Sequence, residues 1–484
     1  MMIDFSYLVR ETNLVGGEWI SADEGRTIDV LNPATGEVVA KVPDCGAAET
    51  RRAIEAAHAA FPTYSALSVA ERARLMRKLH ELIVEHTDAL AAILTTEQGK
   101  PFAEAKAEVG SSAAYVLWFA EEIRRAGGSV IPSPWEGRKL MTTRHPVGVV
   151  AAITPWNFPS SMLARKLGPA LAAGCTAVVK PASATPLSGL VWGVLAEMAG
   201  FPKGVVNIVT GSARQIGGEL TSNPMVRKIT FTGSTEIGRQ LLRDSAATVK
   251  KVSMELGGNA PFIVFDDADL DRAVEGALIA KFRNAGQTCI CSNRIYVQSG
   301  IYDRFVERFS ERVAALRVAP GMEEGAEQGP LVDAAAVEKV EELIGDAMKK
   351  GAQLATGGRR HARGGLFFEP TVLRNASPDM RVTSEEIFGP VAPVYRFDTD
   401  DEVIAAANDT IYGLAAYAYT TSLPRAFRLQ DRLEYGLFGI NEVLIVTPEA
   451  PFGGMKQSGL GREGSWQGLD DFLETKYTCV GGLS

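Results

Sequence analysis

Cys289 is the residue of this chain best suited to covalent chemistry. It lies in the sequence GQTCIC at 286–291, between a predicted helix and a predicted strand. A loop placement suits an accessible nucleophile, although a free cysteine more often packs in a core. No histidine occurs between His145 and His361, and the three earlier histidines fall in predicted N-terminal helices. A Cys-His hydrolase pair therefore has no obvious second member.

Glu255 is the candidate base in place of a histidine. It ends the strand-like run KKVSME and is followed, one residue later, by two glycines. A carboxylate in a partly apolar cleft has a raised pKa and can take a proton from water, while a plain surface glutamate is the alternative. We predict no metal site, because Cys-x-Cys is shorter than the usual zinc spacing and no histidine pair lies at ligand spacing.

Three loops carry residues that could hold a phosphorylated cofactor: TPWNFP at 154–159, KPAS at 180–183 and TGS at 232–234. Gly233 and Ser234 stand at a strand-to-helix turn, where backbone N–H groups and a helix N-terminus can bind phosphate. Lys180 would supply a cation nearby. An ordinary tight turn and a surface lysine are the alternatives. The GxGxxG pattern at 459–464 follows KQS rather than a strand, so we interpret it as a loop.

Alternating strand-like and helical runs are expected to position these loops. From 147 to 255 the chain repeats this alternation, with helices predicted at 159–173, 186–199, 213–222 and 235–243. The rhythm predicts βα units and a doubly wound parallel sheet, with ligands outside the carboxyl ends of its strands. A second α/β series begins after 258, and an amphipathic helix starts at Ser68 with capping-box spacing and runs to Gly99.

The composition describes a globular chain of several domains. Its 484 residues are 46% hydrophobic and carry 58 acidic against 50 basic residues, a net charge of -8. Because acidic residues outnumber basic ones and no run of Lys and Arg occurs, we do not expect a nucleic-acid partner. No apolar run approaches the roughly 20 residues of a membrane span. The five cysteines are few and odd in number, which argues against a disulfide framework and favours a reducing compartment. The first residues also lack the basic and apolar pattern of a secretory signal, so the cytoplasm is the expected location.

Seven motifs together resemble the aldehyde dehydrogenase superfamily over nearly the whole chain. They occur in that family's order and approximate spacing: TPWNFP at 154, KPAS at 180, FTGSTEIG at 231, MELGG at 254, GQTC at 286, EEIFGP at 385 and PFGGMKQSGLGREG at 451. FRNAGQTCICSNR and the KQSGLGREGS ending are similar to the succinate-semialdehyde dehydrogenases. We therefore expect an NAD(P)-dependent oxidoreductase.

The resemblance implies an α/β fold in three parts. A doubly wound cofactor domain is expected at 1–122 and 143–255, and a catalytic α/β domain with the nucleophile at 256–465. A small β-hairpin oligomerisation arm is expected at 123–142 and 466–484, where the run GGSVIPSPWEGRKLM could form a hairpin that pairs with the tail. Such exposed strand edges need partners, which favours a homo-oligomer, either a tetramer or a dimer.

The resemblance also implies roles for individual residues. Cys289 would attack an aldehyde, the Asn157 amide and the Cys289 backbone N–H would hold the oxyanion, and Glu255 would activate water against the thioester. Relatives that transfer the acyl group to coenzyme A lack this glutamate, so we expect a free acid as product. The implied cofactor contacts are Trp156, Asn157, Lys180, Ser183, Gly233, Ser234, Leu256, Glu386 and Phe388.

The residue at position 183 is the sharpest indication of cofactor choice. NAD-preferring relatives often carry a glutamate there, which would repel a 2′-phosphate, whereas Ser183 beside Lys180 can accept one. We predict NADP as the cofactor, with NAD as the alternative.

Arg165 and Arg283 match two arginines that bind the substrate carboxylate in succinate-semialdehyde dehydrogenases. Each taken alone is an ordinary surface arginine more often than a ligand. Val446 stands where that group has a serine, so succinate semialdehyde, glutarate semialdehyde and sulfolactaldehyde all remain open as short anionic substrates.

Cys291 could form a disulfide with Cys289 under oxidant, or could be a second buried thiol. The rival functions are a thiol hydrolase or acyl transferase without nicotinamide, and a non-catalytic scaffold.

Overall fold

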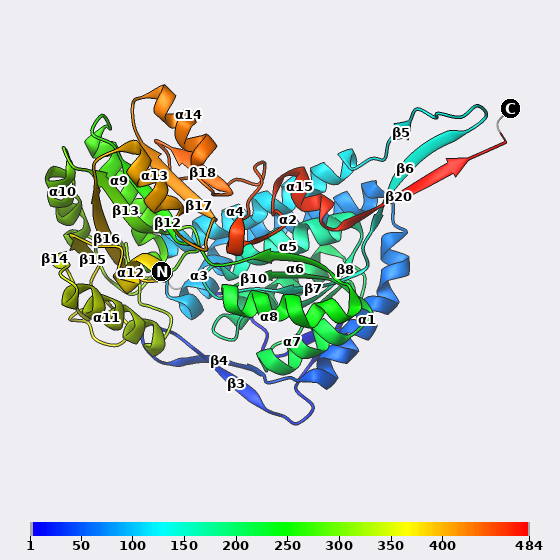
Figure 1. The fold of residues 1–484 in the computed structure, drawn as a ribbon. Helices are drawn as coiled ribbons and strands as arrows, with labels where there is room; N and C mark the ends of the chain where they lie inside the picture. Colours follow the sequence, from blue (N-terminus) through cyan, green and yellow to red (C-terminus); the bar gives the residue numbers. More distant parts are fainter. Residues whose placement is uncertain (1–2, 483–484) are drawn as a thin grey trace.

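The first sheet forms one half of the molecule in this computed structural model, which describes residues 3–482 (Figure 1). Its eight strands have the order β19-β11-β10-β7-β8-β9-β1-β2, and the pairs from β11 to β9 are all parallel. The parallel strands are β7 (Val149–Ile153), β8 (Thr176–Lys180), β9 (Val206–Ile208), β10 (Val226–Thr232) and β11 (Lys251–Glu255). The helices between them are α5 (Pro159–Ala173), α6 (Pro186–Ala199), α7 (Ala213–Ser222) and α8 (Thr235–Ser245). The predicted doubly wound sheet is confirmed.

Both edges of this sheet are antiparallel, which the sequence pattern did not indicate. At one edge β1 (Asn13–Val15) and β2 (Glu18–Ile20) follow β9, and at the other β19 (Gly459–Leu460) pairs with β11. The chain therefore returns to the first sheet after completing the second. A separate hairpin contains β3 (Thr27–Leu31) and β4 (Val38–Pro43).

The predicted helix from Ser68 to Gly99 is wrong, because the structure has two helices there. The N-terminal helices are α1 (Ala47–Ser65), α2 (Val69–Glu85), α3 (Thr87–Gln98) and α4 (Phe102–Glu122). The chain turns at His86, which has φ −100° and ψ 18° between the two helices, and the Thr87 hydroxyl donates to the carbonyl oxygens of Ile83 and Val84 at the end of α2. Ser68 does cap α2, accepting the Glu71 N–H at 3.2 Å.

The second sheet has seven strands in the order β14-β15-β16-β13-β12-β17-β18. They are β12 (Ala260–Val264), β13 (Ser292–Gln298), β14 (Gln353–Thr356), β15 (Thr371–Arg374), β16 (Val391–Phe397), β17 (Ala415–Tyr419) and β18 (Leu437–Ile440). Its helices are α9 (Leu270–Phe282), α10 (Tyr302–Ala314), α11 (Ala334–Lys349), α12 (Arg381–Ser384), α13 (Asp400–Asn408) and α14 (Leu423–Arg432). The predicted second α/β series is present, and β14, β15 and the helices α11 to α14 are additions that the sequence pattern did not reveal.

A three-stranded ribbon projects from the body of the molecule (Figure 1). It comprises β5 (Val130–Ile131), β6 (Lys139–Pro146) and β20 (Leu473–Val480). Strand β20 pairs antiparallel with β6 along its whole length, so the expected pairing of hairpin and tail is confirmed. The ribbon's role in oligomerisation and the three-part division of the chain stay predictions. Within residues 3–482, no helix combines the length and apolar character needed to cross a bilayer.

Candidate active site

Two cavities meet at Cys289. One, of about 320 Å³, lies at the carboxyl ends of the first sheet and is bordered by Asn157, Glu255 and Glu386. The other, of about 300 Å³, is bordered by Arg165 and Arg283. Cys289 borders both, so a ligand in either cavity can reach its sulfur. Both volumes are at the lower end of the range for small-molecule pockets.

A tight turn brings Cys289 to this junction. After α9, Asn284 and Ala285 have positive φ angles of 51° and 55°, and Gly286 has 73°. A Cβ on Gly286 would lie 2.2 Å from the backbone oxygen of Gly389, so only glycine fits there. The Gln287 side chain then donates to the Asn284 carbonyl at 3.1 Å. The loop that presents the thiol is therefore rigidly held.

Glu255 lies at the end of β11, buried to 3% exposure. Neither carboxylate oxygen has a hydrogen-bond partner in the described chain. Burial raises the pKa of Glu255 to about 8, and the negative charge of Glu463 adds to this, while Lys166 and Arg165 oppose it. A buried carboxylate without partners and with a pKa near neutrality is suited to accept a proton.

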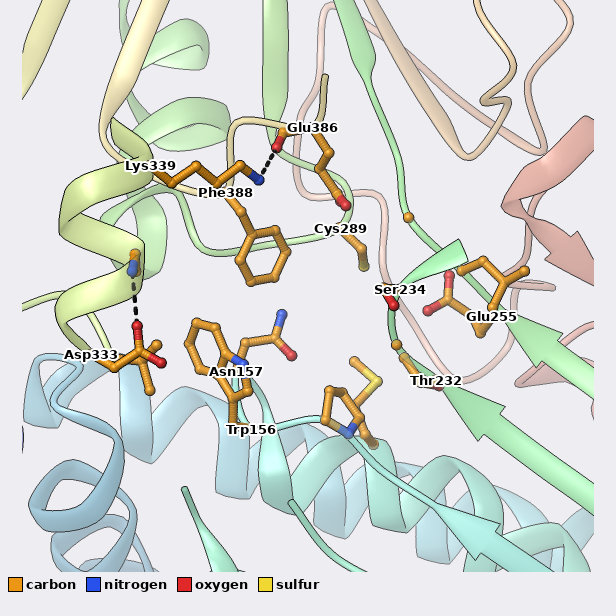
Figure 2. Close-up of a pocket in the computed structure, with 17 residues that line it drawn as sticks. Trp156, Asn157, Thr232, Ser234, Glu255, Cys289, Asp333, Lys339, Glu386 and Phe388 are labelled. Carbon is orange, nitrogen blue, oxygen red and sulfur yellow. Dashed lines mark hydrogen bonds between the residues drawn. The ribbon is translucent and has the colours of Figure 1, made fainter. Parts of the chain in front are cut away.

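The Cys289 thiol is strongly affected by the same surroundings. Burial raises its pKa well above the usual value, and the negative charge of Glu255 raises it further, while Arg165 lowers it. The resting group at neutral pH is thus the thiol. Asn157 lies beside the loop, its Nδ2 donating to the Gln287 carbonyl at 3.0 Å. Figure 2 shows the Asn157 amide, Cys289 and Glu386 around one cavity.

The aromatic pair Trp156 and Phe388 forms one wall of this cavity, with ring centroids 5.5 Å apart and nearly perpendicular. Glu386 accepts the Gly258 N–H at 3.0 Å, and burial raises the pKa of Glu386 to about 7. The Lys339 ammonium donates to the Glu386 backbone oxygen at 2.6 Å (Figure 2). These contacts fix the loop that follows α12.

The turn after β10 is the expected helix N-terminus. Ser234 caps α8, its Oγ accepting the Ile237 N–H at 3.4 Å, and Gly233 and Ser234 border the cavity. A Cβ on Gly238 would lie 2.3 Å from a methyl group of Leu256, so glycine lets α8 pack closely on the sheet. The Gly233 N–H donates to the Glu255 carbonyl at 3.1 Å, which ties this turn to the end of β11.

Lys180 and Ser183 border neither cavity at Cys289; Lys180 ends β8, the neighbour of β7 in the sheet, and Ser183 follows that strand. Lys180 is 6% exposed, its Nζ donates to the Pro181 carbonyl at 3.0 Å, and burial lowers its pKa to about 8. Ser183 is exposed. The N-terminus of α8 and the side chains of Lys180 and Ser183 thus lie at the ends of β10 and β8, the two strands that flank β7. A helix N-terminus, a buried lysine and an exposed hydroxyl at these strand ends suit the phosphates and ribose of a dinucleotide.

The second cavity contains the two predicted arginines. Arg165, on α5, is 4% exposed, and its Nε and Nη1 have no hydrogen-bond partner in the described chain. Its guanidinium lies 4.3 Å from the Phe452 ring centroid and 3.7 Å from Glu463. Arg283 is half-buried, and Val446 borders the same cavity. Two cations with a largely apolar lining favour a small anionic ligand.

Cys291 lies behind the nucleophile. It is 2% exposed, and its thiol donates to the Lys281 carbonyl at 3.2 Å. The disulfide with Cys289 stays a prediction.

The aldehyde dehydrogenase family model matches residues 19–478. A glutarate-semialdehyde dehydrogenase of Pseudomonas aeruginosa is 57% identical over the full length of both chains. The chain belongs to the aldehyde dehydrogenase family. An Escherichia coli K12 relative named succinate-semialdehyde dehydrogenase (NADP+) is 56% identical, covering 99% of this chain and all of its own. A crystal structure of an E. coli NADP-dependent enzyme superposes with a TM-score of 0.98 at 56% identity, over 99% of this chain and all of the other.

Several charged residues of this aldehyde dehydrogenase site escaped the sequence interpretation. Lys166 is buried and donates to Glu463 and, at 2.6 Å, to the Thr232 hydroxyl. Lys100 and Glu108 form a second buried pair. Two adjacent cations, Arg165 and Lys166, in the largely apolar helix SSMLARKLGPALAA were the available signal for the first pair, since a buried lysine needs a partner.

Proposed function

We propose that this protein oxidises a short anionic aldehyde to its acid, with NADP as cofactor and NAD as the alternative. Succinate semialdehyde is the substrate we favour. The observation that carries the proposal is that Cys289 joins a cavity holding Arg165 and Arg283 to one holding Glu255 and Asn157. One cavity then takes the substrate's anionic end, and the other takes the cofactor's reactive end.

In the first half of the reaction, Cys289 loses its thiol proton to water in the cleft. The thiolate attacks the aldehyde carbon, the C–S bond forms, and the carbonyl oxygen becomes an oxyanion. The Asn157 amide and the Cys289 backbone N–H stabilise this charge; one such donor typically contributes about 2.7 to 4 kcal/mol. Bound nicotinamide supplies the acceptor for the hydride that leaves the thiohemiacetal carbon, and a thioester remains on Cys289.

In the second half, Glu255 removes a proton from water as the water oxygen attacks the thioester carbon. The same donors hold the new oxyanion until the C–S bond breaks and the Cys289 thiolate leaves. The acid is released and the proton passes from Glu255 to solvent. Neither Glu255 oxygen has a hydrogen-bond partner within residues 3–482, which suits this role, since no partner there competes for the water's proton.

We propose that the cofactor lies across the β7, β8 and β10 ends. Gly233 and Ser234 would hold phosphate, Glu386 the nicotinamide ribose, and Phe388, Trp156 and Leu256 the nicotinamide end. Lys180 and Ser183 would hold the adenosine end and its 2′-phosphate. The relative named NADP-dependent supports this choice of cofactor.

The Ser183→Glu variant tests the cofactor assignment. A carboxylate beside the 2′-phosphate is expected to lower kcat/KM with NADP by about 10- to 100-fold, and to leave kcat/KM with NAD nearly unchanged. Steady-state kinetics with each nucleotide provides the measurement. A wild-type protein that strongly prefers NAD would contradict the assignment, as would equal loss with both nucleotides.

The arginine clamp predicts a specific loss in the Arg165→Met and Arg283→Met variants. Losing a charge-assisted contact of about 1.5 to 3 kcal/mol should lower kcat/KM for succinate semialdehyde by about 10- to 100-fold, mainly through KM. Butanal, which has no carboxylate, should show little change with Arg283→Met and a smaller loss than succinate semialdehyde with Arg165→Met, because Arg165 also lowers the pKa of Cys289. Arg308→Met, an exposed arginine on α10, serves as control. Equal losses for both aldehydes would contradict the clamp.

Val446 leaves the length of the aldehyde open within this class, and glutarate semialdehyde is the second candidate because a 57% identical relative carries that name. Sulfolactaldehyde also fits two arginines. A thiol hydrolase without nicotinamide is the rival class, and formation of NADPH on mixing with aldehyde separates the two.

We further propose a cytoplasmic homo-oligomer, a tetramer or dimer, in which the β5-β6-β20 ribbon pairs with another copy.

A further inference from the structure

The backbone carbonyl of Asn157 accepts two hydrogen bonds from buried side chains that the reaction above does not use. Lys100 Nζ donates at 2.6 Å and Asn284 Nδ2 donates at 3.1 Å. Lys100 lies between α3 and α4, whereas Asn284 lies in the nucleophile loop. The turn that carries Asn157 is therefore fixed by donors from two distant parts of the chain.

A buried ion pair holds Lys100 in place. Its Nζ donates to Glu108 at 2.7 Å, and both side chains are 0% exposed. The ammonium also lies 3.8 Å from the Phe158 ring centroid. The other Glu108 oxygen accepts the N–H groups of Ser160 and Ser161 at 3.0 and 3.1 Å, in the first turn of α5. Since separating such a pair inside a protein is costly, Lys100 is fixed relative to the start of α5.

Asn284 links the same carbonyl to the nucleophile loop. Its Oδ1 accepts from Gln98 Nε2 at 3.0 Å, and its backbone N–H donates to Glu104 at 2.9 Å. Its Nδ2 also donates to the Gln287 carbonyl at 3.3 Å, the oxygen to which Asn157 Nδ2 donates. The oxyanion donor and the nucleophile loop thus share one buried polar network.

We propose that Lys100 is a positioning residue for the reaction: its ammonium fixes the Asn157 carbonyl and, through it, the Asn157 amide beside Cys289. This inference rests on the proposed function, which assigns Asn157 to the oxyanion. Lys100 borders neither cavity, so it acts through Asn157 and not on the substrate. Oxyanion donors depend steeply on geometry, and a displacement of about 1 Å can cost about 100-fold in rate.

The test is the double variant Lys100→Met/Glu108→Gln, which removes both charges of the buried pair. The glutamine side-chain oxygen at position 108 can still accept hydrogen bonds from the backbone N–H groups at the start of α5. We expect kcat to fall about 10- to 100-fold, with KM for succinate semialdehyde and Kd for NADP within about twofold of wild type. Glu108→Gln alone is the reference, since Glu108 borders the substrate cavity. Lys106→Met removes an exposed lysine of α4, the helix that carries Glu108, and is the matched control. A folded double variant with wild-type kcat would overturn the proposal.

A mutant cycle then separates positioning from general structural support. In an Asn157→Ala background, adding Lys100→Met/Glu108→Gln should change kcat by less than about threefold, because residues that act as a unit are not additive. If the kcat losses of Asn157→Ala and of Lys100→Met/Glu108→Gln instead multiply in the combined variant, the proposal is overturned.

Asn284→Gly removes the second donor to the Asn157 carbonyl, at a positive φ that glycine adopts freely. This variant still tests the proposal if the double variant does not fold. We expect a lower kcat there too, and an unchanged kcat would overturn the proposal. A wild-type protein that oxidises no aldehyde would instead contradict the proposed function itself.

Discussion

Replacing Cys289 by serine is expected to lower kcat for aldehyde oxidation by about 1,000-fold or more, because a serine hydroxyl is a far weaker nucleophile than a thiolate. Affinity for NADP should stay near the wild-type value, since the other cavity-lining groups are unchanged. Stopped-flow measurement of NADPH formation, with fluorescence titration of the nucleotide, provides both quantities. The expected result is a protein that binds its cofactor and forms almost no product.

Cys479→Ser is the matched control for this experiment. Cys479 is an exposed free cysteine in the ribbon, distant in the chain from the cavities, so its loss should leave kcat unchanged. Wild-type turnover in Cys289→Ser would remove the nucleophile assignment. Equal losses in both variants would point to a general effect of thiol removal.

Replacing Glu255 by glutamine is expected to slow hydrolysis of the thioester by about 100- to 10,000-fold, the usual contribution of a general base. Acylation should not slow, because the proposed reaction gives Glu255 no role in that half, and above about pH 8, where Glu255 is charged, its removal favours the Cys289 thiolate. A burst of NADPH close to one per active site should therefore precede a slow steady state. Rapid-mixing kinetics separates the two phases, and loss of the burst together with turnover would contradict this division of roles.

The pH dependence of the steady state adds a second readout for Glu255. Its pKa is raised to about 8, so the carboxylate form that accepts a proton is a minority at pH 7 and increases as pH rises through about 8. Where hydrolysis limits turnover, the wild-type rate should rise over that range. The Glu255→Gln rate should lack this rise. A wild-type rate that falls between pH 7 and 9 would contradict the assignment.

The βα units around the cofactor cavity could be predicted from the sequence because each apolar strand and its helix are contiguous. The predicted helix at 159–173 coincides with α5, and its N-terminal residues follow Asn157 directly. The break between α2 and α3 could not be predicted, since it consists of one residue, His86, with a non-helical ψ of 18°. The antiparallel strand β19 also escaped, because its partner β11 lies about two hundred residues earlier.

The residues that could do chemistry were recognisable by type and motif, whereas the groups that support them were not. Lys100 and Glu108 are eight residues apart, on either side of Pro101, and look like an ordinary loop lysine and an ordinary helical glutamate. Their function depends on burial to 0% exposure and on the Asn157 carbonyl, which are tertiary properties. A pattern in one chain cannot distinguish a solvated lysine from one that contacts a distant backbone oxygen.

The most direct test of the central claim is the mass of the Cys289 peptide after the Glu255→Gln protein is mixed with succinate semialdehyde and NADP and quenched in acid. The account predicts a succinyl thioester on Cys289 that requires both aldehyde and nucleotide. An unmodified Cys289 peptide while NADPH accumulates, or an acyl group on another residue, would contradict it.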